Sequence, residues 1–256
     1  MIKRSICAFI AAFLFLPALS LAHNPEGYTI EVFKTPKAPV IDGKMSDWVW
    51  SHASSTEGEE FKVWAGGKTD GPAKNQTVVY VAWDDDALYV LYECQEPNPK
   101  KLKTVVRNRD GSPIWEDDEI ELFLDVEHDG AAPYFQFIVN AANVQFDLWK
   151  GQGDVGWNGE WESGVTVGTD EWIVELAIPF KTLNVDKPKD GDIWGVNFTR
   201  HVMTVQPTEW TTWATMGARG FHMPELFGDM IFKEESLEVS PLGKAALTWG
   251  EVKAGE

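Results

Sequence analysis

The chain has 256 residues, with 22 basic and 40 acidic side chains and a formal net charge of −18 at pH 7. A surface with this charge repels phosphate backbones, which excludes nucleic acid as the expected partner. The 13 tryptophans all follow residue 22, and they are more than a hydrophobic core of this size requires, so we expect some of them to face solvent.

Residues 1–22 have the pattern of a secretory signal peptide. Two basic residues precede an apolar stretch over residues 6–16, and Ser20 and Ala22 frame a small-x-small cleavage site. The apolar stretch is shorter than the roughly 20 residues of a membrane-spanning helix, and no later segment reaches that length. We therefore expect an exported protein, periplasmic or secreted, without a membrane span. Removal of the signal leaves Cys94 as the single cysteine, which excludes an intramolecular disulfide.

The remaining chain divides into a lead-in, a patterned region and a tail. Residues 23–37 are mostly polar and lack clear periodicity, residues 38–233 alternate short apolar runs with turn residues, and residues 234–256 are charged and weakly patterned. Strands are predicted at 77–83, 88–93, 119–125, 134–140, 144–149, 164–167, 172–178, 193–201, 210–214 and 229–232. Loops are predicted at 66–74 and 151–159. Because helical periodicity is almost absent, this pattern predicts an all-β fold, an antiparallel β-sandwich of jelly-roll-like topology.

Polar side chains share one face of two consecutive predicted strands. Glu119 and Glu121 alternate with isoleucine and leucine residues that we expect to face the core, and Gln136 and Asn140 alternate with phenylalanine and valine in the next strand. If the two polar faces adjoin, they form a surface suited to a sugar, whose C–H faces pack on aromatic rings while its hydroxyls need hydrogen-bonding partners. An ordinary solvated sheet face explains the same alternation.

Seven segments resemble carbohydrate-binding module family 9 in the order expected for that family, and together they cover about residues 38–233. They are PVIDG at 39–43 with DW at 47–48, WDD at 83–85 with LYV at 88–90, WEDDEIELFLD at 115–125, YFQF at 134–137, WIVELAIP at 172–179, GDIWGVNFTR at 191–200 and PELFG at 224–228. The resemblance implies a β-sandwich that binds the ends of β-linked glucans, xylans or small sugars between two tryptophans, with calcium ions in structural roles.

By this resemblance, Trp115 matches the first of the two tryptophans and Glu121 matches a polar sugar contact. A loop position beside four acidic residues favours the ligand role for Trp115 over a role as a lid on the core. The second tryptophan falls at Trp213 or Trp210. Because residues three apart face opposite ways on a straight strand, one of them is expected in the core, and the neighbouring threonines favour Trp213 as the exposed one.

Other polar residues complete the candidate site. Gln136 and Asn140 on their strand face, and Arg109 in the loop before Trp115, are candidate sugar contacts, and an ion pair with the acidic cluster is the alternative role for Arg109. Asp125 and Asp129 are candidate ligands for a structural calcium ion, because calcium requires several oxygen ligands. An ordinary solvated acidic turn is the alternative for these two residues.

Three other functions fit parts of the sequence. Cleavage after Ala22 leaves His23 at the N-terminus, as in copper-dependent polysaccharide monooxygenases, although here it lies on the lead-in. Related sandwiches bind b-type haem in electron-transfer proteins, and His201 and Met203 share an expected strand face. Adjacent carboxylates suggest a glycosidase, but they alternate between strand faces and no cleft is marked. We therefore expect non-catalytic binding of a saccharide, a glycan end or short oligomer, compatible with action alongside glycoside hydrolases.

Overall fold

The computed structural model describes residues 24–151 and 156–238. The predicted signal peptide, His23 and most of the predicted tail lie outside these residues. The strands are β1 (Thr29–Lys34), β2 (Ser54–Ser55), β3 (Lys62–Ala65), β4 (Lys68–Pro72), β5 (Thr77–Trp83), β6 (Ala87–Gln95), β7 (Glu119–Asp125), β8 (Tyr134–Asn140), β9 (Gln145–Lys150), β10 (Glu162–Val167), β11 (Glu171–Pro179), β12 (Ile193–Val202), β13 (Glu209–Thr212) and β14 (Gly228–Ser236). Four short 3₁₀ helices are η1 (Trp48–Ser51), η2 (Pro99–Lys101), η3 (Ile114–Glu116) and η4 (Pro224–Leu226). No helix among the described residues is long and apolar enough to cross a membrane.

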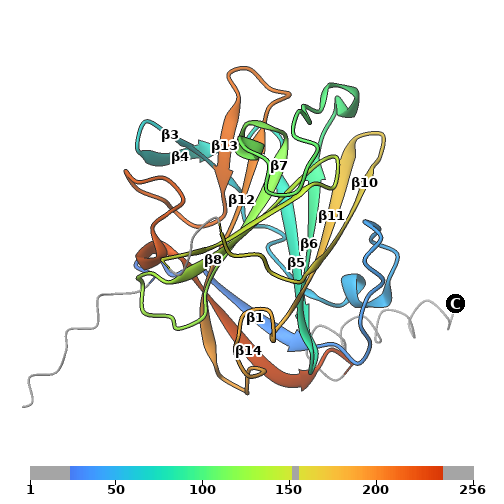
Figure 1. Ribbon diagram of the computed structural model, residues 1–256, viewed down its shortest axis with the longest axis vertical. Coiled ribbons are helices and arrows are strands. Elements are labelled where there is room, and N and C mark those ends of the chain that lie inside the picture. Colours follow the sequence, from blue (N-terminus) through green and yellow to red (C-terminus); the bar gives the residue numbers. More distant parts are fainter. Residues whose placement is uncertain (1–23, 152–155, 239–256) are drawn as a thin grey trace, which may run out of the picture.

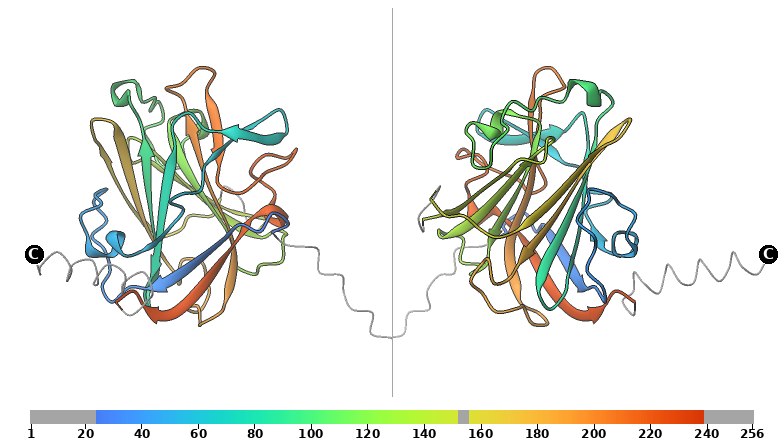
Figure 2. Two further views of the ribbon diagram at one scale, coloured as in Figure 1. Left: turned by 180° about the vertical axis from the view of Figure 1, so that it is seen from behind. Right: turned by 45° about the vertical axis from the view of Figure 1, so that its right-hand side comes forward.

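The strands form one continuous hydrogen-bonded sheet that folds over itself into two packed layers (Figures 1 and 2). One layer has the order β10-β11-β6-β5, and the other has the order β9-β8-β7-β12-β13-β3-β4. The parallel pair β1 and β14 joins the two layers, because β1 also pairs with β5 and β14 also pairs with β12. The all-β sandwich predicted from the sequence is therefore confirmed, with β1 as its parallel exception.

Local chemistry explains the central hairpin of the first layer. The carboxylate of Asp84 accepts the backbone N–H groups of Asp86 and Ala87 at 2.8 and 2.9 Å, which closes the turn between β5 and β6. An aspartate that bonds the backbone two residues on is a common turn device. The flanking strands are rich in valine, tyrosine and leucine, which suit a strand buried on both faces.

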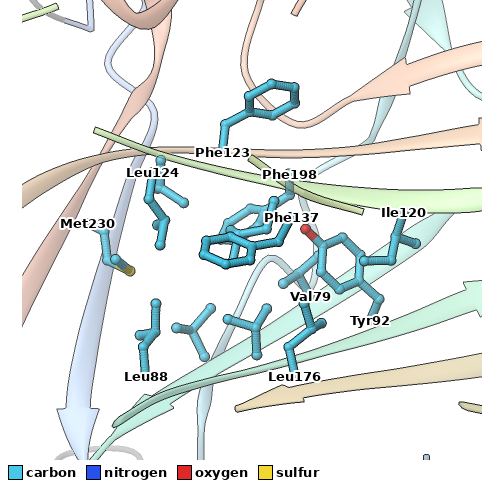
Figure 3. Packing of buried hydrophobic residues seen from close by; sticks show 14 of the residues in the cluster. Val79, Leu88, Tyr92, Ile120, Phe123, Leu124, Phe137, Leu176, Phe198 and Met230 are labelled. Atoms are coloured by element: carbon cyan, nitrogen blue, oxygen red, sulfur yellow. The ribbon is translucent and has the colours of Figure 1, made fainter. Parts of the chain in front are cut away.

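The core lies between the two layers (Figure 3). Ile120, Leu122 and Leu124 of β7 are fully buried there, as their alternation predicted. They face a layer that contributes Val79, Leu88, Tyr92 and Leu176, as Figure 3 shows. Burial of apolar area at about 25 cal/mol per Å² makes this interface the main source of stability.

The outer face of β7 is covered at one end and open at the other. Phe123 points away from the core between the layers, yet it is fully buried. The connection between β13 and β14 covers it, because the rings of Phe221, His222 and Phe227 lie 5.6 to 6.4 Å from the Phe123 ring. The uncovered end of this face is therefore hollowed rather than flat.

The prediction of the sandwich boundaries and of one loop is wrong in two places. β1 lies inside the predicted lead-in, buries Ile30 and Val32, and pairs with β14, which itself continues past residue 233. β4 lies inside the loop predicted at 66–74. The polar and glycine residues of β4 are mostly exposed at the sheet edge, so the strand carries no hydrophobic alternation that a sequence pattern can reveal.

Candidate functional site

The outer face of β7, β8 and β9 forms the floor of a pocket of about 430 Å³. Glu121 pairs with Ile138, which pairs with Phe146, and Gln136 pairs with Leu148. Directly paired residues of neighbouring strands project from the same face of a sheet, so these five side chains line the floor together. The volume falls within the range of roughly 300–1,000 Å³ typical of small-molecule sites.

Three tryptophans form the walls of this pocket. Trp64 on β3 and Trp210 on β13 are directly paired and form one wall. Trp115 in η3 forms another wall; it is 38% exposed and its ring lies edge-on to Phe146 at 6.2 Å. The expectation that Trp115 faces solvent is confirmed, and the ring does not act as a lid sealed over the core.

The expectation that Trp213 is the exposed member of the Trp210–Trp213 pair is wrong. Trp213 is fully buried, its ring packs against Phe198 and Tyr28 at 5.3 Å, and its indole N–H donates to Glu59. Trp210 is the partly exposed residue that lines the pocket. The two residues do face opposite ways, but Thr211 and Thr212, which favoured Trp213, are themselves buried, and Thr215 is half-buried. Hydroxyl groups near a tryptophan therefore gave no information about its exposure.

His201 on β12 contacts both walls and was not predicted as a site residue. Its ring stacks on Trp210 with centroids 3.8 Å apart, and its Nδ1 donates to the backbone carbonyl of Trp115 at 2.7 Å. Since a carbonyl only accepts, Nδ1 carries the proton. Burial lowers the pKa of His201, with a smaller opposing effect of the hydrogen bond to the Trp115 carbonyl, and this favours the neutral ring.

The floor contains a buried acidic group. Glu121 accepts a hydrogen bond from the Gln136 amide, and burial raises the pKa of Glu121 to about 7 despite that bond. Glu119, two residues earlier on the same face, is fully buried, and burial followed by the charge of Glu121 raises its pKa well above its usual value. The pair therefore retains a proton near neutral pH. Glu121 and Gln136 both line the pocket, as the predicted sugar contacts should.

Asn140 does not reach the pocket. Its amide donates to Asp117 and to the Val106 carbonyl at 3.0 and 3.1 Å, and its oxygen accepts the backbone N–H groups of Ala142 and Val144 at 3.0 Å. The residue therefore closes the turn between β8 and β9. Its position at the end of the strand, where the turn needs donors and acceptors, explains why it is absent from the pocket lining.

Arg109 also has a structural position. Its guanidinium pairs with Asp147, and it donates to the Asn158 side chain and the Gly159 carbonyl at 2.9 Å. These contacts tie the loop before η3 to the segment after β9. Arg109 is absent from the pocket lining, and its ion pair is with Asp147 rather than with the acidic cluster of β7.

The carboxylates of the candidate calcium residues accept backbone hydrogen bonds in this structure. The two carboxylate oxygens of Asp125 accept the backbone N–H groups of His128 and Gly130 at 3.0 and 2.9 Å, and Asp129 accepts from Ala131 at 2.9 Å. Within the part of the chain that the structure describes, no three histidine, cysteine or carboxylate side chains are grouped to hold a metal. These aspartates instead shape the turn after β7.

The haem hypothesis receives no geometric support. Met203 lies beyond the end of β12, and its backbone N–H donates to Asp118 at 2.8 Å. The ring of His201 stacks on Trp210, and its Nδ1 donates to the Trp115 carbonyl. Nδ1 of His222 shares a hydrogen bond with the Tyr134 hydroxyl at 2.7 Å. The copper hypothesis concerns His23, which lies outside the described residues.

The fold and the pocket define a β-sandwich domain with an aromatic, partly polar pocket on an outer sheet face. Residues 41–235 match the family described as carbohydrate family 9 binding domain-like, and the chain belongs to this family. Among curated proteins, it is 35% identical over 165 residues to endo-1,4-beta-xylanase A of Thermotoga maritima and 34% identical to that of Thermotoga neapolitana. Each match covers 62% of this chain and 13% of the xylanase, so the chain corresponds to a small part of either enzyme.

Solved structures share the fold at low sequence identity. A family 9 carbohydrate-binding module from Caldicellulosiruptor kristjanssonii in complex with glucose is 24% identical, with a TM-score of 0.57 over 83% of this chain and 100% of that one. The same source provides a complex with cellotriose, at 23% identity and a TM-score of 0.54 over 82% and 97% of the two chains. A putative carbohydrate-binding protein from Bacteroides uniformis is 18% identical, with a TM-score of 0.57 over 81% and 100%.

Proposed function

We propose that this protein binds a saccharide, a glycan end or short oligomer, in the pocket between Trp115 and the Trp64–Trp210 wall. The observation that carries the proposal is that indole rings from three separate elements surround one pocket whose floor holds Glu121 and Gln136. The solved family 9 modules bound to glucose and cellotriose support the same class of ligand.

The physical roles follow from the chemistry of a sugar ring. Trp115 and Trp210 cover its apolar C–H faces, so that Trp210 replaces Trp213 as the second tryptophan of the clamp. Glu121 and Gln136 bond hydroxyls at the rim. These bonds are needed because a buried hydroxyl without a partner costs about 1–3 kcal/mol.

The binding is proposed to be non-catalytic. Glycoside hydrolysis uses two carboxyl groups that flank the scissile bond on opposite sides. Among the described residues, the pocket lining includes one carboxylate, that of Glu121, and Glu119 lies buried on the same strand. This arrangement supports a protein that holds its ligand and leaves the bond intact.

We propose that the mature protein acts outside the cytoplasm, in the periplasm or after secretion. The support is the signal pattern of residues 1–22. Mass spectrometry of the protein recovered from periplasm and medium should show an N-terminus at His23. An intact Met1 in a soluble cytoplasmic fraction would contradict export.

Calorimetric titration with glucose, cellotriose and xylobiose tests the site. Trp115→Ala and Trp210→Ala should each weaken binding at least about tenfold, a loss of about 1.4 kcal/mol. Trp48→Ala is the matched control, because Trp48 is 43% exposed and lies outside the pocket lining. Failure of the wild type to bind any sugar, or an equal loss in the Trp48 variant, would contradict the proposal.

A further inference from the structure

Four directly paired side chains form a polar block on the outer sheet face at the pocket. β12 lies between β13 and β7, and its residues His201 and Thr199 pair with Glu119 and Glu121 of β7. Paired residues of neighbouring strands have Cβ atoms about 4.5–5.5 Å apart, so the four side chains are neighbours on one face. Trp210 of β13 and Glu121 of β7 line the pocket, which places the two β12 residues beneath it, between these two side chains.

Three members of this block are buried and have polar atoms without hydrogen-bond partners. Glu119 and Thr199 are fully buried, and His201 is 4% exposed. Within the described residues, no group completes a hydrogen bond to either carboxyl oxygen of Glu119, to Oγ1 of Thr199 or to Nε2 of His201. Buried polar atoms in native proteins nearly always have a partner, either a protein group or a bound oxygen atom. Unpartnered atoms that gather in one block therefore indicate a bound polar group.

The hydrogen-bonding capacities of these atoms are complementary to a neutral hydroxyl group. Nδ1 of His201 carries the proton that bonds the Trp115 carbonyl, so Nε2 is an acceptor. Burial raises the pKa of Glu119 well above its usual value, followed by the charges of Glu121 and Asp118, and the His201 backbone N–H opposes this rise more weakly. The carboxyl of Glu119 therefore keeps its proton and acts as a donor. A hydroxyl group can donate to the first of these atoms and accept from the second.

We propose that Glu119, Thr199 and His201 form a hydroxyl-binding site beneath the pocket, occupied by a water molecule or by a hydroxyl group of the bound sugar. Nε2 accepts the hydroxyl proton, the Glu119 carboxyl donates to the hydroxyl oxygen, and Oγ1 of Thr199 is the third partner. A buried water requires two to four such partners. The site adjoins Glu121, which is paired with Thr199 and lines the pocket floor. Only the sugar form of this site rests on the proposed saccharide function.

Crystal structures of the processed protein without sugar and with glucose test the inference. Both should show an oxygen within about 3.2 Å of His201 Nε2 and of a Glu119 carboxyl oxygen if the occupant is water. An oxygen that appears only with glucose, continuous with the density of the sugar, identifies a sugar hydroxyl. A direct hydrogen bond between the Glu119 carboxyl and His201 Nε2, or no oxygen at this position in either structure, overturns the inference.

The sign of a stability change gives a second measurement. Thr199→Val keeps the shape of the side chain and replaces Oγ1 with a methyl group. A buried hydroxyl without a partner costs stability, so its removal from a dry site raises the urea midpoint of unfolding, whereas removal of a partner of the bound hydroxyl lowers it. We expect the midpoint to fall by about 0.4 M. Thr29→Val, at an exposed position of β1, is the control and should leave the midpoint unchanged. A midpoint of Thr199→Val that equals or exceeds that of the wild type, or an equal fall in Thr29→Val, overturns the inference.

These outcomes are distinct from those of the proposed function. The sugar-free structure and the stability of Thr199→Val do not depend on a saccharide. A protein that holds the oxygen but binds no sugar therefore contradicts the proposed function alone. A protein that binds sugar without an oxygen at this position contradicts the hydroxyl-binding site alone.

Discussion

His201 connects the two walls of the pocket, and its replacement by phenylalanine tests whether that connection matters. His201→Phe retains an aromatic ring that can stack on Trp210 but removes the hydrogen bond to the Trp115 carbonyl. A fully buried carbonyl without a partner costs about 1–3 kcal/mol, and the Trp115 carbonyl is only part-buried, so we expect the free energy of unfolding to fall by about 1 kcal/mol. Sugar affinity should fall with it, because Trp115 loses the contact that holds its backbone.

His201→Asn makes the complementary change. The asparagine amide can replace Nδ1 as donor to the Trp115 carbonyl, but the stack on Trp210 is lost. Aromatic pairs are worth about 0.5–1.5 kcal/mol beyond their buried area, and the missing ring atoms leave a cavity, so we expect a loss of about 2 kcal/mol in stability. Comparison of the two variants separates the hydrogen bond from the stack.

The chain offers a matched control. His52 stacks on Trp48 at 4.1 Å, and its Nδ1 lies 2.9 Å from the Trp48 carbonyl, so it makes the same two kinds of contact, with a solvent-exposed hydrogen bond, at a half-buried position outside the pocket. His52→Phe should change stability by less than about 0.5 kcal/mol and leave sugar affinity unaltered. Urea unfolding and calorimetric titration measure both quantities. The reasoning is refuted if His201→Phe matches the wild type in stability and affinity, or if His52→Phe costs as much.

Three further predictions concern stability measured by urea unfolding. Burial raises the pKa of Glu121 from 4.5 to about 7, so the stability contributed by the protonated carboxyl is complete below pH 4.5 and is lost as the pH rises through 7. Glu121→Gln should therefore gain stability relative to the wild type between pH 4.5 and 8. A difference in stability that stays constant with pH contradicts the raised pKa of Glu121. Glu175 accepts the Trp50 indole N–H and three backbone N–H groups at 2.6 to 3.3 Å. Glu175→Gln should lower the free energy of unfolding by about 2 kcal/mol, whereas Glu171→Gln should lower it little. Equal losses in the two variants would refute the stabilising role of the Glu175 hydrogen bonds. Gly43 has φ of 75°, and a Cβ there would lie 2.5 Å from the backbone of β10. Gly43→Ala should lower the free energy of unfolding by more than about 2 kcal/mol. An unaltered unfolding midpoint would show that the close contact with β10 relaxes.

Most of the fold was predictable because its strands carry the periodicity that burial imposes. β5, β7 and β8 have the predicted bounds, since apolar residues there alternate with polar residues or fill both faces. β1 and β4 were missed for different reasons. β1 has an alternating core face, but it is short and stands before the patterned region, and β4 is polar because it lies at an exposed edge.

The pocket residues were predictable where alternation within one strand assigns them to a face, and at Trp115, where the family resemblance and the acidic neighbours indicated an exposed ring. Glu121 and Gln136 were identified because alternation within β7 and β8 assigns them to one face. Trp64 and His201 were not, because their relation to Trp210 depends on the register of β3 and β12 against β13. Strand register over such sequence separations follows from the packed structure, and no local pattern encodes it.

The same register explains why the pocket can be preorganised. Trp64, Trp210, His201 and Glu119 are successive partners across β3, β13, β12 and β7, so they form one row on the outer face. Each ring in this row is fixed by the hydrogen bonds of its strand and by the neighbouring side chain. His201 also connects the row to the backbone of Trp115. The aromatic rings of the pocket are therefore already in place, and a saccharide bound there as proposed would not lose affinity in ordering them.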